Sequence, residues 1–404
     1  MEFFTYTLPN GIRCIYKRIK SPVAYCAVTV NTGSRDELAA EQGMAHFTEH
    51  MLFKGTQHRR AYHINSRLEK LGGELNAFTT KEETVVHATT LKTDYTKAAE
   101  LISDVIFNST FPPHEVEREK EVVLDEINSC KDSPPERIYD EFEDMLFAGS
   151  PLGHNILGTK ASVSKMTEES VRNFTGRCYN TDQVLFSLSA DVTEKSFLKT
   201  AERYFGVIPA SCRTFSRSAP GEAKPFSKSV GRNTHQAHCI MGARAYDNKH
   251  PRRIALALLV NILGGPAANS RLNVLLREKN GLTYNAEAGY TPYSDTGIAT
   301  IYFSSDRDNT HRCMQLAEHL LDEAKNKPLS TLQLAAAKKQ FAGQFSIAME
   351  GKEGYMLGAA KSYLLHNEID TPEAVYKKLC SVTSAEIMEV ANEIFGAPLT
   401  LIYK

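Results

Sequence analysis

The expected secondary-structure elements follow the same order in both halves of this chain, and this repeat constrains the fold more than any other feature. Alternating Val and Thr residues and helix-spaced apolar residues predict, in each half, a strand, helices, two strands, helices and a closing strand. Leu75-Asn76-Ala77 and Tyr284-Asn285-Ala286 lie 209 positions apart, and each triplet begins a pair of strands. The pattern predicts an α+β fold of two similar domains from an internal duplication, each a mainly antiparallel sheet covered by helices.

A change in composition marks the boundary between the halves. Residues 209–233 are rich in Ser, Arg, Lys, Pro and Gly and have little periodicity, which is typical of a linker. The chain of 404 residues is also longer than one usual core, which favours two domains of about 200 residues. We therefore expect a first domain at residues 1–208, a linker at 209–233 and a second domain at 234–404.

Composition argues against several classes of protein. The net charge of -1 and the lack of a basic stripe on any expected helix argue against binding to nucleic acid. No apolar run approaches the roughly 18 residues needed to span a membrane. The eight cysteines are scattered without a Cys-x-x-Cys pair, as in proteins of reducing compartments. The start of the sequence lacks an export signal or an Arg-rich transit peptide, so we expect a cytoplasmic protein unless a targeting segment has been removed.

The segment from Gly43 to Phe53 carries the residues with the clearest chemical role. His46 and His50 stand four positions apart in a run that suits a packed helix, so both imidazoles lie on one face. Glu49 lies close to the same face. Two imidazoles suit Zn²⁺, and a carboxylate beside them can take a proton from water. The order His-x-x-Glu-His is the inverzincin signature.

A zinc site needs a third protein ligand, and a carboxylate-rich helix expected at Glu115 to Asn128 offers candidates. Glu119 and Glu126, seven positions apart, project near the apolar face of this helix. Two histidines at this spacing also occur by chance in cores, and a charged helix is often only a solvated surface. Spacing alone therefore leaves both interpretations open.

The combination of these motifs resembles the pitrilysin-type (M16) zinc metallopeptidases, and within them the short-chain branch of mitochondrial processing peptidase and its bacterial homologues. In that family a glutamate follows the last histidine of His-x-x-Glu-His by 76 positions, and this position is Glu126 here. The resemblance implies that His46, His50 and Glu126 bind one Zn²⁺ per chain. It also implies that Glu49 is the general base and Glu119 a supporting catalytic residue.

The resemblance extends to segments that would bind substrate. The sequence from Gly72 to Thr84 matches the family pattern Gly-Gly-x-x-Asn-Ala-x-Thr, which forms a strand that pairs with the substrate. By this match the substrate-binding residues are Asn76, Ala77, Phe78 and Thr79. In the second half, Leu276 to Tyr284 matches Arg-Glu-x-x-Gly-Leu-x-Tyr, which implies that Arg277 and Tyr284 contact the substrate carbonyl and the transition state.

The second half lacks the metal motif. The offset of 209 positions pairs His46 with Ala255, Glu49 with Leu258 and His50 with Leu259. No His-x-x-Glu-His occurs after the linker. We therefore expect a metal-free second domain that contributes substrate contacts.

The resemblance implies a zinc metalloendopeptidase that cleaves extended peptides or unfolded segments. It implies a half-clamshell chain that forms a closed dimeric chamber, as a homodimer or as a heterodimer with an inactive homologous subunit. The alternative is a catalytically silent or partner-dependent subunit of a processing-peptidase-like complex. Such subunits typically lack ligands, whereas all three ligand positions and the base are present here.

Overall fold

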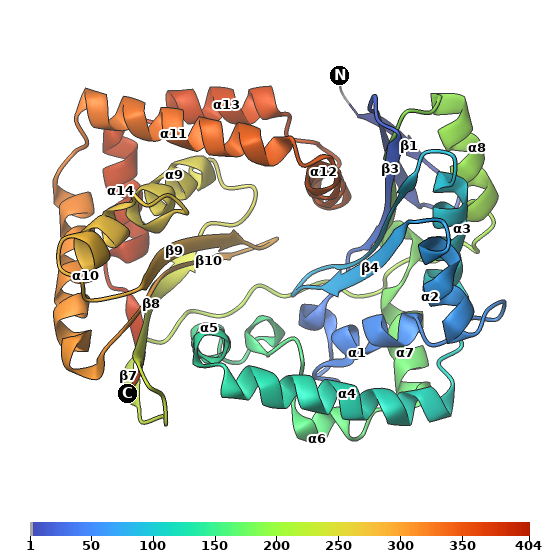
Figure 1. The fold of residues 1–404 in the computed structure, drawn as a ribbon, viewed down its shortest axis with the longest axis horizontal. Coiled ribbons are helices and arrows are strands. Elements are labelled where there is room, and N and C mark those ends of the chain that lie inside the picture. Colours follow the sequence, from blue (N-terminus) through green and yellow to red (C-terminus); the bar gives the residue numbers. More distant parts are fainter. Residues whose placement is uncertain (1–2) are drawn as a thin grey trace. The chain divides into compact units, whose positions relative to one another are not determined.

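The computed structural model describes residues 3–404, and these divide into two compact units, each built around one β-sheet (Figure 1). Neither unit is continuous in sequence. Unit 1 contains the described residues up to Ser129 together with His154–Ser218 and Ala348–Thr371. Unit 2 contains Cys130–Gly153, Ala219–Ile347 and Pro372–Lys404.

The sheet of unit 1 has six strands in the order β1-β2-β6-β3-β5-β4. β2 and β6 are parallel, and the other neighbouring pairs are antiparallel. Runs of Val, Thr and Ala give the central strands, which are largely buried. The strands are β1 (Phe4–Thr7), β2 (Arg13–Arg18), β3 (Val23–Val30), β4 (Glu74–Thr79), β5 (Thr84–Leu91) and β6 (Val184–Ala190).

Helices pack on both faces of this sheet. The main core of unit 1 joins one face to α3 and α8, and α12 covers the other face through two smaller apolar clusters. The helices are α1 (Met44–Leu52), α2 (Ala61–Glu69), α3 (Tyr95–Phe107), α4 (Pro113–Asp132), α6 (Lys160–Val163), α7 (Glu168–Cys178), α8 (Glu194–Tyr204) and α12 (Lys352–His366), with short 3-10 helices at Ser34–Asp36 and Thr181–Gln183. The last three residues of α4 belong to unit 2.

The sheet of unit 2 has five strands in the order β7-β11-β8-β10-β9, with β7 and β11 parallel and the rest antiparallel. The strands are β7 (Ser227–Val230), β8 (Ala237–Ala245), β9 (Asn285–Pro292), β10 (Gly297–Ser305) and β11 (Leu399–Tyr403). The helices are α5 (Pro134–Leu146), α9 (Arg253–Gly264), α10 (Thr310–Asn326), α11 (Thr331–Met349, whose last two residues belong to unit 1), α13 (Pro372–Ser381), α14 (Ser384–Phe395), a π-helix at Asn273–Glu278 and short 3-10 helices at Pro151–Gly153 and Arg307–Asn309. Among residues 3–404, no helix is both long and apolar enough to cross a membrane.

The two sheets with their helices confirm the predicted α+β fold. The units, however, are not the continuous domains expected at 1–208 and 234–404. Two helices are exchanged: α5 belongs to unit 2 and α12 to unit 1. The buried side chains of α5, among them Ile138 and Phe142, pack with Ile240 and Leu401 of the unit 2 sheet. The exchange thus occurs because the apolar face of each of these helices packs on the sheet formed mainly by the other half of the sequence.

The segment expected to be a linker is also more ordered than its composition indicates. Within residues 209–233, Ser227–Val230 forms strand β7, which pairs with β11. Earlier in this segment, Arg213 and Arg217 belong to unit 1, where their buried guanidinium groups pair with Asp36. Long-range pairing therefore replaces the loose connection that local sequence predicts.

Candidate metal centre

Helix α1 presents one apolar face to the core of unit 1 and one polar edge. Met44, Phe47 and Met51 recur at helical spacing and are buried, so they fix the rotation of the helix. This rotation places His46 and His50 one turn apart on the half-buried edge, with their ring centroids 4.5 Å apart. The local sequence thus positions both imidazoles.

Helix α4 brings a carboxylate to the same place. The Oε2 atom of Glu126 lies 3.7 Å from Nε2 of His46 and 3.7 Å from Nε2 of His50. One ligand atom from each of these three residues falls within a span of 4.8 Å. Among residues 3–404, this is the only such group of three His, Cys, Asp or Glu side chains.

The hydrogen bonding of this group fits a bound cation. The Oε2 atom of Glu126 is buried and has no hydrogen-bond partner, which is costly for a carboxylate oxygen. An ion between Oε2 and the two Nε2 atoms would satisfy it. Two imidazole nitrogens and one carboxylate oxygen form a catalytic type of zinc site, in which a fourth position stays open. The donor set therefore fits Zn²⁺.

Glu119 contacts the ring nitrogen of His50 that faces away from Glu126, and Lys54 in turn contacts Glu119. Oε1 of Glu119 lies 2.7 Å from Nδ1 of His50, and Oε2 of Glu119 lies 2.6 Å from Nζ of Lys54. A carboxylate that accepts the Nδ1 proton leaves Nε2 free to bind a metal. Lys54, just beyond α1, was not among the residues expected from the sequence. Its position four residues after His50 was the available signal.

The two histidines have opposite pKa shifts. Burial, and then the neighbouring His50, lower the pKa of His46 to about 4, so this imidazole is neutral near pH 7. Burial also acts to lower the pKa of His50, but the hydrogen bond to Glu119 and the nearby carboxylates raise it overall. Burial acts to raise the pKa of Glu119, yet His50 and Lys54 lower it overall. The carboxylate of Glu119 therefore stays ionised beside His50.

Glu49 is joined to the edge strand of the sheet. The hydroxyl of Thr79, at the end of β4, donates a hydrogen bond of 2.5 Å to Oε2 of Glu49. Burial raises the pKa of Glu49, and the hydrogen bond from Thr79 partly opposes this. From the sequence, Thr79 was expected only to bind substrate. The structure adds a direct contact with the candidate base.

The remaining expected substrate residues lie on β4 and in unit 2. β4 forms one edge of the unit 1 sheet, and α1 packs beside it. The side chain of Ala77 packs against the main core, whereas that of Phe78 packs towards α12. Arg277 and Tyr284 belong to unit 2, and both side chains are exposed.

Comparison with known proteins places this chain in a family. The model of the insulinase family, peptidase family M16, matches residues 13–160, and the model of the peptidase M16 inactive domain matches residues 165–341. An uncharacterized zinc protease of Rickettsia bellii is 30% identical over 370 residues, which cover 91% of this chain and 89% of the relative. One from Bacillus subtilis is 29% identical over 391 residues, which cover 96% of this chain and 95% of the relative. The chain therefore belongs to the M16 family of peptidases.

Solved structures show the same fold. A protease from Helicobacter pylori aligns with a TM-score of 0.92 at 20% identity, covering 100% of this chain and 99% of that chain. A structure from Pseudomonas fluorescens, described as a peptidase M16 inactive domain, also aligns with a TM-score of 0.92 at 20% identity, covering 100% of this chain and 98% of that chain. The two-sheet architecture of this chain is therefore that of M16 proteins.

Proposed function

We propose that this chain is a zinc-dependent endopeptidase whose His46, His50 and Glu126 hold one Zn²⁺. The observation that carries the proposal is the convergence of two imidazole nitrogens and one carboxylate oxygen within 4.8 Å. Membership of a peptidase family with relatives described as zinc proteases supports it. The presence of all three donors and of Glu49 argues against a catalytically silent subunit.

The proposed mechanism assigns a separate task to each neighbouring side chain. When bound, Zn²⁺ supplies a Lewis acid that polarises a carbonyl group and makes water easier to deprotonate. Glu49 takes the proton of the attacking water and later gives it to the leaving amine. Thr79 donates to Oε2 of Glu49, which leaves Oε1 as the less occupied oxygen for proton transfer. Glu119 keeps the Nδ1 proton of His50 in place.

The edge strand β4 supports an extended peptide as the substrate. Within the described part of the chain, β4 pairs with β5 on one side and has no strand on the other. An added strand would bind through main-chain hydrogen bonds, independently of most side chains. We therefore propose that extended peptides and unfolded segments are preferred over folded proteins, with Asn76, Ala77, Phe78 and Thr79 forming the docking strand.

A homodimer with shared sites completes the proposal. The resemblance to short-chain M16 peptidases implies that Arg277 and Tyr284 of one copy act on substrate held by the other copy. Both side chains are exposed, and a guanidinium or a phenol can donate to a carbonyl oxygen. We propose that opening and closing of the dimer admits substrate. We propose a cytoplasmic location, as the scattered cysteines without a Cys-x-x-Cys pair indicate.

Metal analysis combined with peptide hydrolysis tests the proposal. We expect one zinc ion per chain and cleavage of an unstructured peptide that stops when a chelator removes the metal. His46→Gln should lose both zinc and activity. The matched control His58→Gln should keep both, because His58 binds Asp104 and is outside the one candidate metal group found among residues 3–404. Absence of zinc and of hydrolysis in the wild-type protein would favour the silent subunit.

A further inference from the structure

The N-terminus of α1 is capped by a residue from outside the helix. The N-cap residue is Gly43, which has no side chain to accept the free amides of the first turn. A Cβ at this position would lie 2.6 Å from the carbonyl oxygen of Leu157, so the packing excludes a larger N-cap residue. Glu37 takes over this role. Its Oε2 accepts from the amide of Gly43 at 2.9 Å, and its Oε1 accepts from the amide of Ala45 at 2.8 Å.

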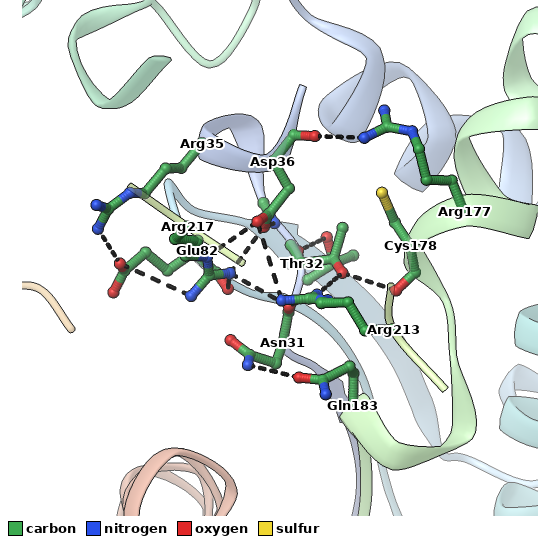
Figure 2. Close-up of polar contacts among 12 residues, drawn as sticks. Asn31, Thr32, Arg35, Asp36, Glu82, Arg177, Cys178, Gln183, Arg213 and Arg217 are labelled. Carbon is green, nitrogen blue, oxygen red and sulfur yellow. Dashed lines mark hydrogen bonds and ion pairs between the residues drawn. The ribbon is translucent and has the colours of Figure 1, made fainter. Parts of the chain in front are cut away.

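The segment before Glu37 is fixed by a buried ionic cluster (Figure 2). Asp36, at the end of the 3-10 helix, accepts from Nε and Nη2 of Arg217 at 2.9 and 2.7 Å. Its carboxylate also accepts from the amide of Gly33, and its carbonyl oxygen accepts from Arg177. Arg217 also donates to the carbonyl oxygen of Glu82. These bonds hold the backbone beside Glu37 from several directions.

The position of Glu37 matters for charge as well as for geometry. Its side chain is buried, and the first turn of a helix carries about half a positive charge. His46 is the third residue of α1, so a divalent cation on its imidazole lies near this unfavourable end. A carboxylate bonded to the first-turn amides opposes that partial charge. Burial raises the pKa of Glu37 to about 8, so near neutral pH the metal-free chain holds this side chain largely protonated, and a nearby cation favours its ionised form. Glu37 therefore orients the ligand helix and, when ionised, makes its N-terminus more tolerant of a cation.

We propose that Glu37 is a positioning residue for the metal centre, acting through the amides of Gly43 and Ala45 on the helix that carries His46, Glu49 and His50. This inference rests on the proposed zinc site. It predicts that the affinity for zinc, and not only the stability of the fold, depends on the carboxylate of Glu37. A purely structural role would change stability alone.

Glu37→Gln tests this inference because it keeps the size of the side chain but turns one acceptor into a donor that opposes an amide. The matched control is Glu41→Gln, which makes the same charge change nearby. Glu41 accepts from the amide of Leu38 and pairs with Arg177, and its side chain binds no amide of α1. The readouts are the dissociation constant for Zn²⁺ in competition with a chelator, the absorption spectrum of the Co²⁺-loaded chain, kcat and KM with saturating zinc, and Tm.

We expect Glu37→Gln to weaken zinc binding about 10-fold, the lower end for residues that support metal ligands. The Co²⁺ spectrum should change, and kcat should fall more than KM changes. Glu41→Gln should keep the wild-type zinc affinity and spectrum. Equal zinc affinity in the wild type and Glu37→Gln would overturn the inference even if Tm falls.

Two further outcomes keep the test decisive. If Glu37→Gln does not fold, Glu37→Asp replaces it, because this variant keeps the charge but is too short to reach both amides. Unchanged zinc affinity in Glu37→Asp would then overturn the inference. Failure of the wild-type chain to bind zinc would instead overturn the proposed function, so the two failures are distinguishable.

Discussion

The two units have sheets of the same strand order but differ in the helix that follows the central strand. The order β2-β6-β3-β5-β4 in unit 1 matches β7-β11-β8-β10-β9 in unit 2, including the single parallel pair. Helix α1 follows β3, and α9 follows β8 at the equivalent place. The polar edge of α1 carries His46, Glu49 and His50, whereas Leu258 and Leu259 of α9 are buried in the core.

The helices that follow the second strand pair differ in the same way. Helix α4 is rich in carboxylates and contributes Glu119 and Glu126 to the candidate centre. Helix α11, in the corresponding place of unit 2, contains no acidic residue. The two units therefore have similar sheets, and the candidate metal ligands are a few side chains on two helices of unit 1. The model of the peptidase M16 inactive domain matches residues 165–341, whereas the metal-free second domain expected at 234–404 stays a prediction.

The strongest test of this difference removes the carboxylate of α4. Glu126→Gln should abolish zinc binding and activity, because the neutral amide is a much poorer zinc ligand than the carboxylate. The control Asp125→Asn changes the adjacent exposed side chain and should keep zinc. Metal content after dialysis and peptide hydrolysis measure both. If Asp125→Asn loses zinc and Glu126→Gln keeps it, the ligand is Asp125 and the assignment of Glu126 is wrong.

Removing the base should separate metal binding from catalysis. We expect Glu49→Gln to retain zinc and to lower kcat by about 10²–10⁴, the usual contribution of a general base. Glu49 accepts from Thr79 but is outside the group of three donors, which is why zinc should remain. Metal analysis and steady-state kinetics of the same sample measure this. Near-normal turnover would refute the assignment of Glu49.

A mixing experiment asks whether unit 2 contributes to catalysis without holding metal. Glu49→Gln and Tyr284→Phe chains should each be nearly inactive alone. If sites are shared in a homodimer, a 1:1 mixture should recover about a quarter of wild-type activity, because half of the dimers are mixed and each has one intact site of two. Activity after demonstrated subunit exchange measures the recovery. No recovery, or full activity of a proven monomer, would contradict shared sites.

The support behind His50 predicts a smaller effect. Lys54→Met removes the ammonium group that holds Oε2 of Glu119, so His50 should be less well oriented. We expect zinc affinity to fall about 10-fold, as for other residues behind metal ligands. The control Lys97→Met removes a lysine that pairs with Asp94 at the surface. Chelator competition compares the two variants, and equal affinities would rule out this role for Lys54.

The dependence of stability on pH gives the subtlest test. Burial raises the pKa of Glu37 from an ordinary value of 4.5 to about 8. The hydrogen bonds from the amides of Ala45 and Gly43 lower this pKa and only partly offset the burial. Between these two pH values the folded metal-free chain holds a proton that the unfolded chain releases, so the free energy of unfolding should fall as pH rises. Glu37→Gln should reduce this slope. Denaturant unfolding from pH 5 to 8 measures it, and identical slopes would contradict the pKa shift.

Local sequence predicts much of the fold and the grouping of the candidate ligands. The apolar spacing of α1 and the alternation in β4 and β5 depend on neighbouring residues, so their positions follow from the sequence. The seven-residue spacing of Glu119 and Glu126 likewise places both carboxylates near one face of α4. The resemblance to M16 peptidases supplied the choice of Glu126, which periodicity alone left open.

Long-range contacts explain what the sequence did not predict. The apolar face of α5 shows that this helix must pack, but not on which sheet. Arg217 stands among residues typical of a linker, yet its partner Asp36 lies 181 positions away. The contacts of Glu37 with α1 and of Thr79 with Glu49 likewise depend on tertiary structure. No local pattern distinguishes these residues from ordinary polar ones.

The exchange of α5 and α12 has a consequence for biosynthesis. A growing chain emerges from the ribosome in order, and domains usually fold as soon as their sequence is complete. The face of the first sheet that includes Ile15 and Leu185 is covered by residues of α12, which are translated near the end of the chain. The first sheet is completed by β6, at Ala190, so this face stays uncovered until α12 has been translated. The nascent chain exposes an apolar surface during this period, and such a surface favours binding to chaperones.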